Sequence, residues 1–218
     1  MSYLSKTTRL DIAFAVGYLA QEQVNPQPIH YKLISHLLSY LATNRRMGLL
    51  CRKNSDANSK IELYADADFA TDKSRVSTTG YLVRYHGSVI HWVSRLQSGI
   101  AESSTEAELK SLTEAAHEAL YIVRLQQELL SVSELPIVAY EDNEATYEKY
   151  IAVTRKNKLK HIEMMYFKVV EYVREGLFDL RLVGTQEQLA DGLTKALPER
   201  LFVPMFTQLM YNDNDQEQ

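Results

Sequence analysis

The sequence predicts a mixed α/β domain: three antiparallel strands, a long helix, then alternating strands and helices, all preceded by a helical hairpin. Three observations predict this class. Apolar and polar residues alternate along 61–69, as in a strand with two different faces. Two further strand-like stretches flank His86 and Gly87, which is typical of a hairpin. After Ser103, apolar residues recur at the spacing of one helix face.

Bulk properties fit such a domain and exclude several classes. The chain has 218 residues, 45% hydrophobic and 24% charged, which is enough apolar content for a core. Its net charge of −4 means that any basic surface for nucleic acid must be local. Cys51 is the only cysteine, which excludes an internal disulfide and fits a reducing compartment. Without a secretory signal or a run of roughly 18 apolar residues, we expect an intracellular protein that does not enter membranes.

The first 47 residues predict two helices that form a hairpin. Helical apolar spacing runs from Ile12 to Ala20, with Thr7 or Thr8 as the N-cap, and Asn25-Pro26-Gln27-Pro28 ends this helix. A second apolar stripe runs from Leu33 to Leu41. These apolar faces are too large to stay in water, so they must pack either on the main domain or on another protein.

The elements of the main domain follow in order. A short strand over 48–52 and a polar turn over 53–60 precede the strand 61–69, the strands 80–85 and 88–94, and a short fourth strand over 99–102. The long helix begins after Ser103-Ser104-Thr105, where Ser103 with Glu106 and Thr105 with Glu108 both have capping-box spacing. The domain then continues with a strand over 135–140, two helices separated by a basic loop, a strand over 178–183 and a helix from Thr185 to near Pro198. The tail is acidic, and we expect it to be disordered.

Four carboxylates, Asp66, Glu108, Asp142 and Asp191, fall at strand ends or on helices of this plan. Acidic side chains cannot stay ionised together unless a positive charge neutralises them, and hard divalent cations prefer oxygen ligands that they share with phosphates. This pattern favours a metal-dependent phosphodiesterase. Three of the four also have a structural alternative: a solvated strand face for Asp66, the helix dipole for Glu108 and a helix cap for Asp142. Asp191 has none, because Asp is a mediocre residue within a helix.

Five motifs carry a resemblance to a known family: YADADFATDKSRVSTTGY, SSTEAELKSLTEAAHEAL, YEDNEAT, KHIE and EQLADGLTKALP. In this order they resemble the ribonuclease H domain of copia-type retrotransposon polyproteins. The earlier stretches YLSKTTRLDIAFAVGYLAQ and YLATNRRMGLL resemble the segment that connects the reverse transcriptase to that domain. The resemblance implies a connecting segment over 1–47, a ribonuclease H-like mixed sheet over 48–200 and a C-terminal extension over 201–218.

The resemblance also implies the chemistry. Asp66, Glu108, Asp142 and Asp191 match the family's catalytic carboxylates, which would hold two Mg²⁺ ions, or Mn²⁺ in their place, about 4 Å apart at the scissile phosphate. The expected reaction is hydrolysis of the RNA strand of an RNA/DNA hybrid. Three acidic neighbours compete for these positions in the motifs, namely Asp68, Glu106 and Glu141.

Binding of the hybrid is expected to depend on local basic and polar side chains, because the phosphate backbone dominates affinity and 2′-hydroxyls distinguish RNA. The candidates lie near the first strand, after Asp142 and in the basic loop: Lys73, Arg75, Ser77, Thr78, Asn143, Arg155, Lys156, Lys158, Lys160 and His161. A further expected partner is the polymerase part of the reverse transcriptase, or another protein, on the N-terminal helices. The resemblance places the protein in a cytoplasmic virus-like particle or the nucleus.

Two other functions remain open at this point. A host-adopted or partner-subunit protein could keep the fold for binding without nuclease activity. An integrase-like phosphoryl transferase shares the fold class but would not explain EQLADGLTKALP. The intact carboxylates favour catalysis, because a purely structural descendant has no physical reason to keep a repelling acidic cluster.

Overall fold

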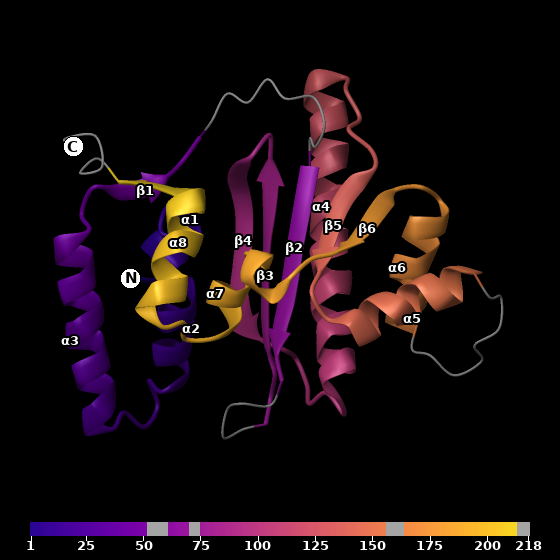
Figure 1. Cartoon of the computed structure of the whole chain (residues 1–218). Helices are drawn as coiled ribbons and strands as arrows, with labels where there is room; N and C mark the ends of the chain where they lie inside the picture. Colours follow the sequence, from indigo (N-terminus) through magenta and orange to yellow (C-terminus); the bar gives the residue numbers. More distant parts are fainter. Residues whose placement is uncertain (52–60, 70–74, 156–163, 213–218) are drawn as a thin grey trace.

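The computed structural model describes residues 1–51, 61–69, 75–155 and 164–212 (Figure 1). The predicted turn over 53–60, much of the basic loop and the tail from 213 lie outside these residues. The elements, in chain order, are α1 (Ser2–Thr7), η1 (Leu10–Ile12), α2 (Ala13–Gln21), α3 (Pro28–Thr43), β1 (Met47–Leu49), β2 (Ile61–Asp68), β3 (Thr78–Tyr85), β4 (Ser88–Leu96), α4 (Ser104–Leu130), β5 (Ile137–Glu141), α5 (Glu144–Arg155), α6 (Met164–Arg174), β6 (Phe178–Leu182), η2 (Thr185–Glu187), α7 (Asp191–Thr194), α8 (Glu199–Leu209) and β7 (Met210–Asn212).

The central sheet has five strands in the order β4-β3-β2-β5-β6. The pairs β2–β3 and β3–β4 are antiparallel, whereas β2–β5 and β5–β6 are parallel. This arrangement confirms the predicted fold class, a mixed sheet of three antiparallel strands followed by parallel ones. The β3–β4 turn is also as predicted, because His86 (φ 48°) and Gly87 (φ 78°) both adopt the left-handed conformation that two-residue hairpin turns require.

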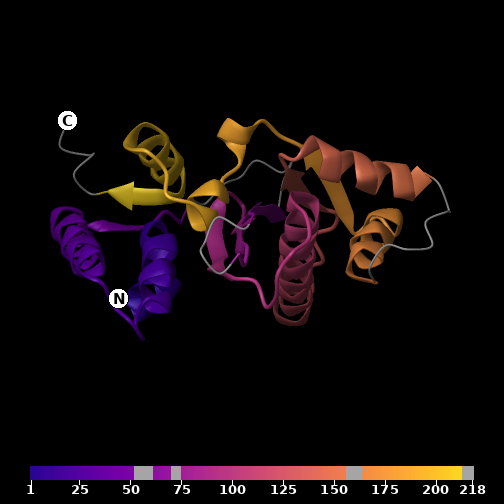
Figure 2. The ribbon, with the colours of Figure 1, turned by 90° about the horizontal axis from the view of Figure 1, so that it is seen from below.

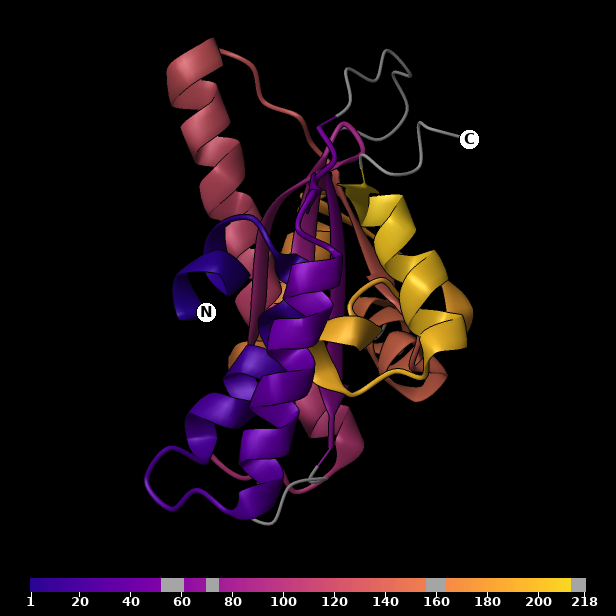
Figure 3. The same cartoon turned by 90° about the vertical axis from the view of Figure 1, so that its left-hand side faces the viewer.

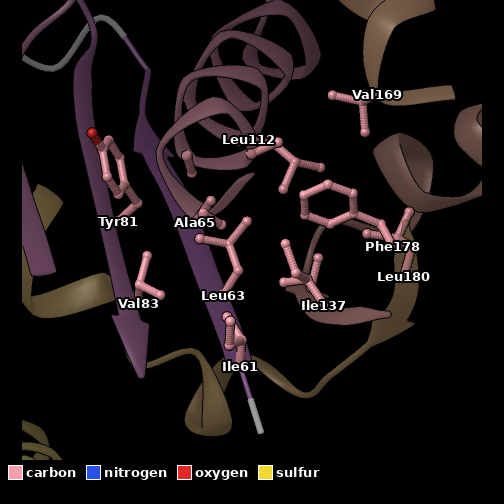
Figure 4. Packing of buried hydrophobic residues seen from close by; sticks show 14 of the residues in the cluster. Ile61, Leu63, Ala65, Tyr81, Val83, Leu112, Ile137, Val169, Phe178 and Leu180 are labelled. Carbon is pink, nitrogen blue, oxygen red and sulfur yellow. The ribbon is translucent and has the colours of Figure 1, made fainter. Parts of the chain in front are cut away.

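One face of the sheet packs against α4, α5 and α6 and forms the main hydrophobic core. Ile61, Leu63 and Ala65 of β2 point into this core, which Leu112 of α4 and Phe178 of β6 complete (Figure 4). These β2 residues lie on the predicted apolar face, since alternate residues of a strand point the same way. Burial of this face against a 27-residue helix fixes the position of α4 along β2.

Segments from both ends of the chain cover the opposite face. Leu10 and Ala13 from the N-terminal part pack with Tyr64 of β2, Leu193 of α7 and Phe206 of α8 in a second core cluster. Figure 2 shows the sheet between this group of helices and α4, and Figure 3 shows α4 and α8 on opposite sides of the strands. The small antiparallel sheet β1–β7 joins the end of the N-terminal segment to the C-terminal segment.

Polar contacts also attach the N-terminal segment to the domain. The Trp92 indole N–H donates to the carbonyl of Ser5 at 2.8 Å. Arg9 forms a buried ion pair with Asp11 at 2.7 Å, and the Tyr40 hydroxyl donates to the same carboxylate at 2.7 Å, which links η1 to α3. Of the two possibilities left open for the N-terminal helices, packing on the domain is realised for α2, which contacts β4 and α7. By contrast α3 leaves several apolar residues exposed: Ile29, Tyr31, Leu33 and Leu38.

The structure corrects five local predictions. Residues 99–102 form no strand, and the strand expected over 48–52 is Met47–Leu49. Thr7 and Thr8 end α1 instead of capping the next helix, since the Thr7 hydroxyl donates back to Tyr3. The helix expected from Thr185 is a 3-10 turn, Thr185–Glu187, followed by the separate α7. Residues 199–212, predicted only as an extension, form α8 and β7.

Candidate active site

The four predicted carboxylates meet at one end of the central sheet. Asp66 lies near the carboxyl end of β2, and Asp142 directly follows β5, its parallel neighbour. Glu108 comes from the second turn of α4, which packs on β2, and Asp191 begins α7, which packs on β2 and β3. The charge of Asp66 raises the pKa of each of the other three. Carboxylates far apart in the sequence therefore form one electrostatically coupled group around Asp66.

Asp66 is buried, with 4% of its surface exposed, and its side chain is held from two directions. The Thr194 hydroxyl donates to Oδ2, and the Lys195 ammonium lies 3.7 Å from the same oxygen. Its backbone carbonyl accepts a hydrogen bond from the Ser111 hydroxyl of α4 at 2.8 Å. Asp66 does not occupy a solvated strand face, so that structural alternative is removed.

Glu108 is buried on the side of α4 that faces β2, whereas its competitor Glu106 points outward. Glu106 pairs with Lys110 at 2.6 Å and accepts from the backbone N–H of Glu102, and Ser103 caps the helix by accepting from the Glu106 N–H. Capping is thus complete without Glu108, whose Oε2 atom is buried and has no hydrogen-bond partner. Burial, followed by the charges of Asp66, Glu141 and Asp142, raises the pKa of Glu108 to about 10.

Asp142 is half-buried, and its predicted alternative role belongs to its neighbour. Asn143 caps α5 by accepting from the backbone N–H of Thr146 at 3.0 Å, so Asp142 is free of that role. Burial and then Asp66 raise the pKa of Asp142, against the lowering effects of Lys195 and of a hydrogen bond from Gln188. Its other neighbour, Glu141, is fully buried, and burial raises its pKa to about 8. Glu141 is thus a fifth carboxylate beside the predicted four.

Asp191 is 6% exposed and pairs with Lys195, one turn later, at 2.9 Å between Oδ1 and Nζ. Burial and then the charge of Asp66 raise the pKa of Asp191 to about 6, although Lys195 opposes this shift. One ammonium group therefore lies between two carboxylates. A positive charge at this place is what a cluster of buried carboxylates requires.

Three side chains around this site were not predicted: Gln188, Thr194 and Lys195. The Gln188 amide is fully buried and donates to the carbonyl of Ala65 at 2.9 Å, which ties the segment before α7 to β2. A signal for Thr194 and Lys195 was present in the sequence, because positions three and four residues after Asp191 share its face of a helix. It was not used, because the sequence alone does not show that this segment packs against β2 and β3.

The donor set fits a hard divalent cation by its chemistry, since it consists of carboxylate oxygens, with buried and unpaired Oε2 atoms on Glu108 and Glu141. Among the described residues, however, no three His, Cys, Asp or Glu side chains already converge closely enough to hold an ion. Lys195 is the cation between Asp66 and Asp191 in this arrangement. Metal binding would require this ammonium to move and the carboxylates to turn inward.

The predicted nucleic-acid contacts are only partly described. Arg75 is exposed next to β3 and has a positive φ of 56°, Thr78 and Asn143 are half-buried, and Ser77 is fully buried. The Ser77 hydroxyl therefore does not reach the surface in this conformation. Lys73 and the side chains of the basic run lie outside the described residues: Arg155, Lys156, Lys158, Lys160 and His161.

The fold and the site together define a mixed α/β domain with an acidic centre at the carboxyl ends of its central strands. Retrovirus-related Pol polyproteins from transposon RE1 of Arabidopsis thaliana and transposon TNT 1-94 of Nicotiana tabacum are each 34% identical to this chain, over 89% and 93% of its length. The chain spans 13% and 15% of these polyproteins. The chain is homologous to this part of the transposon Pol polyproteins, which confirms the resemblance found in the sequence.

Other comparisons cover less of the chain. Secreted RxLR effector protein 161 of Plasmopara viticola is 40% identical over 55% of this chain and 84% of its own length. The solved structure of LC11 ribonuclease H1, isolated from compost, is similar over 63% of this chain and 94% of that chain, with a TM-score of 0.47 and 17% identity. No family model matches the sequence. Among the described residues, no helix has the length and apolar content to cross a membrane.

Proposed function

We propose that this chain is the ribonuclease H of a copia-type retrotransposon, a metal-dependent endonuclease that cuts the RNA strand of RNA/DNA hybrids during reverse transcription. One observation carries the proposal. Four carboxylates from separate segments of the chain meet at one end of the sheet, in a homologue of part of the transposon Pol polyproteins. The raised pKa values of Glu108, Asp142 and Asp191 support the proposal, because a cluster that is costly to ionise without a cation is expected of a site that binds one.

In this proposal Asp66, Glu108, Asp142 and Asp191 hold two Mg²⁺ ions. When bound, such a pair lowers the pKa of an attacking water and stabilises the leaving 3′ oxygen, which gives 5′-phosphate products. Asp66 is the natural shared ligand, because its charge influences all three other carboxylates. Lys195, once displaced from Asp66 and Asp191, stays close enough to neutralise a phosphate of the substrate backbone.

The proposed grip on the hybrid uses Arg75, Thr78 and Asn143 beside the site, together with the basic run from Arg155 to His161. Asn143 and Thr78 present polar groups that can contact 2′-hydroxyls in the minor groove. Arg75 and the basic run would neutralise phosphates, so affinity for the hybrid should fall with rising salt.

The test is cleavage of a 5′-labelled RNA paired with DNA, in Mg²⁺ and in Mn²⁺. We expect metal-dependent cutting of the RNA strand alone, and loss of cutting in Asp142→Asn with hybrid binding retained. The matched control is Asp68→Asn, which changes a half-buried aspartate on the same strand face as Asp66 and should keep most of the activity. Near-full activity of Asp142→Asn would refute the assigned site.

A second candidate function is that of a binding partner, and the surface of the N-terminal helices favours it. Ile29, Tyr31 and Leu38 of α3 are each more than half exposed. Beside them an apolar cavity of about 960 Å³ lies between α2, α3 and α8, with Phe14 and Phe202 in its wall. A large exposed apolar surface of this kind is typical of protein–protein contact. A folded protein that binds the hybrid but leaves it uncut under all metal conditions would favour this candidate over the nuclease.

A further inference from the structure

Thr194 occupies a position at the site that the four carboxylates do not explain. It is fully buried at the end of α7, and its hydroxyl donates to Oδ2 of Asp66 on the neighbouring strand β2. The Thr194 hydroxyl oxygen also lies 3.1 Å from the carbonyl oxygen of Asp191. A hydroxyl has one hydrogen, and the nearer, charged acceptor is the Asp66 carboxylate. The hydroxyl therefore acts on Asp66 more than on its own helix.

The methyl group of Thr194 fixes the direction of this hydroxyl. A Cβ added at Gly80 would lie 2.5 Å from Thr194 Cγ2, so the methyl occupies the space that a side chain on β3 would otherwise take. Gly80 is the residue paired with Asp66 in the β2–β3 register. Because the methyl rests over Gly80, the rotamer that points the hydroxyl at Asp66 is the one that packing allows.

We propose that Thr194 is a positioning residue, whose hydroxyl sets the orientation of the Asp66 carboxylate for cation binding. This inference rests on the proposed function. Hydrogen bonds from neighbours orient metal-ligating side chains, and their loss typically weakens metal affinity by roughly 10- to 100-fold. The orientation of Asp66 matters most among the four, because its charge raises the pKa of Glu108, Asp142 and Asp191.

Two substitutions separate the hydroxyl from the methyl. Thr194→Val keeps the branched shape and removes the hydroxyl, whereas Thr194→Ser keeps the hydroxyl and removes the methyl. The control is Thr113→Val, because Thr113 is also buried but its hydroxyl donates to a helix carbonyl, that of Leu109, at 2.7 Å. Mn²⁺ binding is followed by the loss of the free-ion signal in electron paramagnetic resonance, and folding by the thermal midpoint in EDTA.

We expect Thr194→Val to bind Mn²⁺ about 10-fold more weakly than the unchanged protein, and Thr113→Val to stay within about 3-fold. Thr194→Ser should lie between these two, because it keeps the hydroxyl but loses the methyl that holds its direction. Hybrid cleavage by Thr194→Val should recover in part as Mn²⁺ is raised, because the defect lies in metal affinity. If Thr194→Val binds Mn²⁺ as the unchanged protein does, the hydroxyl has no positioning role. Equal weakening by Val and Ser would assign the effect to packing and overturn the proposal as well.

An Asp66→Asn arm separates this inference from the proposed function. If Asp66→Asn leaves Mn²⁺ binding unchanged, or the unchanged protein binds no Mn²⁺, the metal site itself is wrong and both proposals fall. If Asp66→Asn abolishes binding and Thr194→Val has no effect, the metal site stands and only the role of Thr194 is refuted.

Discussion

The helices α4 and α7 each bring one carboxylate to the same site, but they are held in place by different means. α4 has 27 residues, a Ser103 cap and a broad apolar face against the sheet. α7 has four residues, and its N-cap, Ala190, makes no side-chain cap. Such a short helix is not stable by itself. It is held between β3 at Gly80 and Phe206 of α8. The Phe206 ring lies so close to Gly192 that a Cβ added there would be only 2.8 Å from it.

Both helices also carry an acid followed four residues later by a lysine, and the two pairs behave differently. Glu106–Lys110 is 2.6 Å apart, with both side chains about one-fifth exposed, and Lys110 lowers the pKa of Glu106. Asp191–Lys195 is 2.9 Å apart, yet the pKa of Asp191 is raised, because Asp191 is buried beside Asp66. The same local pattern stabilises a helix in one place and neutralises a crowded acidic site in the other.

Among the changes that test this difference between α4 and α7, Gly80→Ala should have the largest effect on activity. The added Cβ would lie 2.9 Å from Leu193 Cβ and 3.1 Å from the Leu193 backbone, so α7 must shift. Overpacking of this kind costs about 1–3 kcal/mol of stability. Hybrid cleavage should fall further than stability, because the shift moves Asp191 and Thr194 together. The matched control is Gly48→Ala, whose Cβ meets nothing within 4 Å; equal activity of the two variants would show that α7 tolerates displacement.

A second test uses pH in the absence of divalent metal. The pKa values of Glu108 and Glu141 are raised to about 10 and about 8, so the folded protein keeps protons that the unfolded chain releases near pH 4. The stability from these groups is complete below the unfolded pKa and is lost as the pH rises through the folded pKa. We expect the free energy of unfolding in urea to fall between about pH 5 and pH 8, by at most about 1.4 kcal/mol per pH unit for each proton.

In the same urea experiment, Glu108→Gln should flatten the pH dependence of the free energy of unfolding and raise that free energy near pH 8. Adding Mg²⁺ to the unchanged protein should have the same two effects. Glu106→Gln is the control on the same helix, since the pKa of Glu106 is lowered and its removal should not stabilise the protein. A steeper loss of stability in Glu108→Gln would contradict the pKa directions at the site.

The two lysines provide a smaller contrast. Lys195→Met removes the cation between Asp66 and Asp191. In EDTA it should lower the free energy of unfolding by about 1–2 kcal/mol. This is less than for a fully buried pair, because the Lys195 side chain is 39% exposed. Lys110→Met should cost at most about 0.5 kcal/mol. Denaturation in EDTA and in Mg²⁺ measures both, and Mg²⁺ should restore most of the loss in Lys195→Met. Equal costs for the two lysines would mean that the α7 pair is an ordinary helix pair.

The smallest effect on activity should come from the local signal that begins α4. Ser103→Ala removes the hydroxyl that accepts from the Glu106 N–H at 3.1 Å, which should cost about 1 kcal/mol. Because packing of α4 on the sheet keeps Glu108 in place, activity per folded molecule should change little. A large loss of activity at unchanged stability would show that the cap, and not the core, positions Glu108.

Prediction from the sequence was best where local patterns are strong. The alternation along β2, the hairpin at His86-Gly87 and the start of α4 at Ser103 were all predicted, because period and turn chemistry are properties of neighbouring residues. It was weakest at the chain ends, where a helix from Thr185 was expected and α8 and β7 were not. Those segments take their form from the face of the sheet on which they pack.

The site divides in the same way. The sequence by itself predicted four carboxylates as one site, through motifs whose spacing resembles a known family, and it determined the alternation that directs Asp66 away from the main core. Only the tertiary structure decided that Asn143 caps α5 in place of Asp142, and that Thr194 and Lys195 reach Asp66. The physical reason is that capping and helical periodicity act over a few residues, whereas burial and charge coupling depend on segments that only folding brings together.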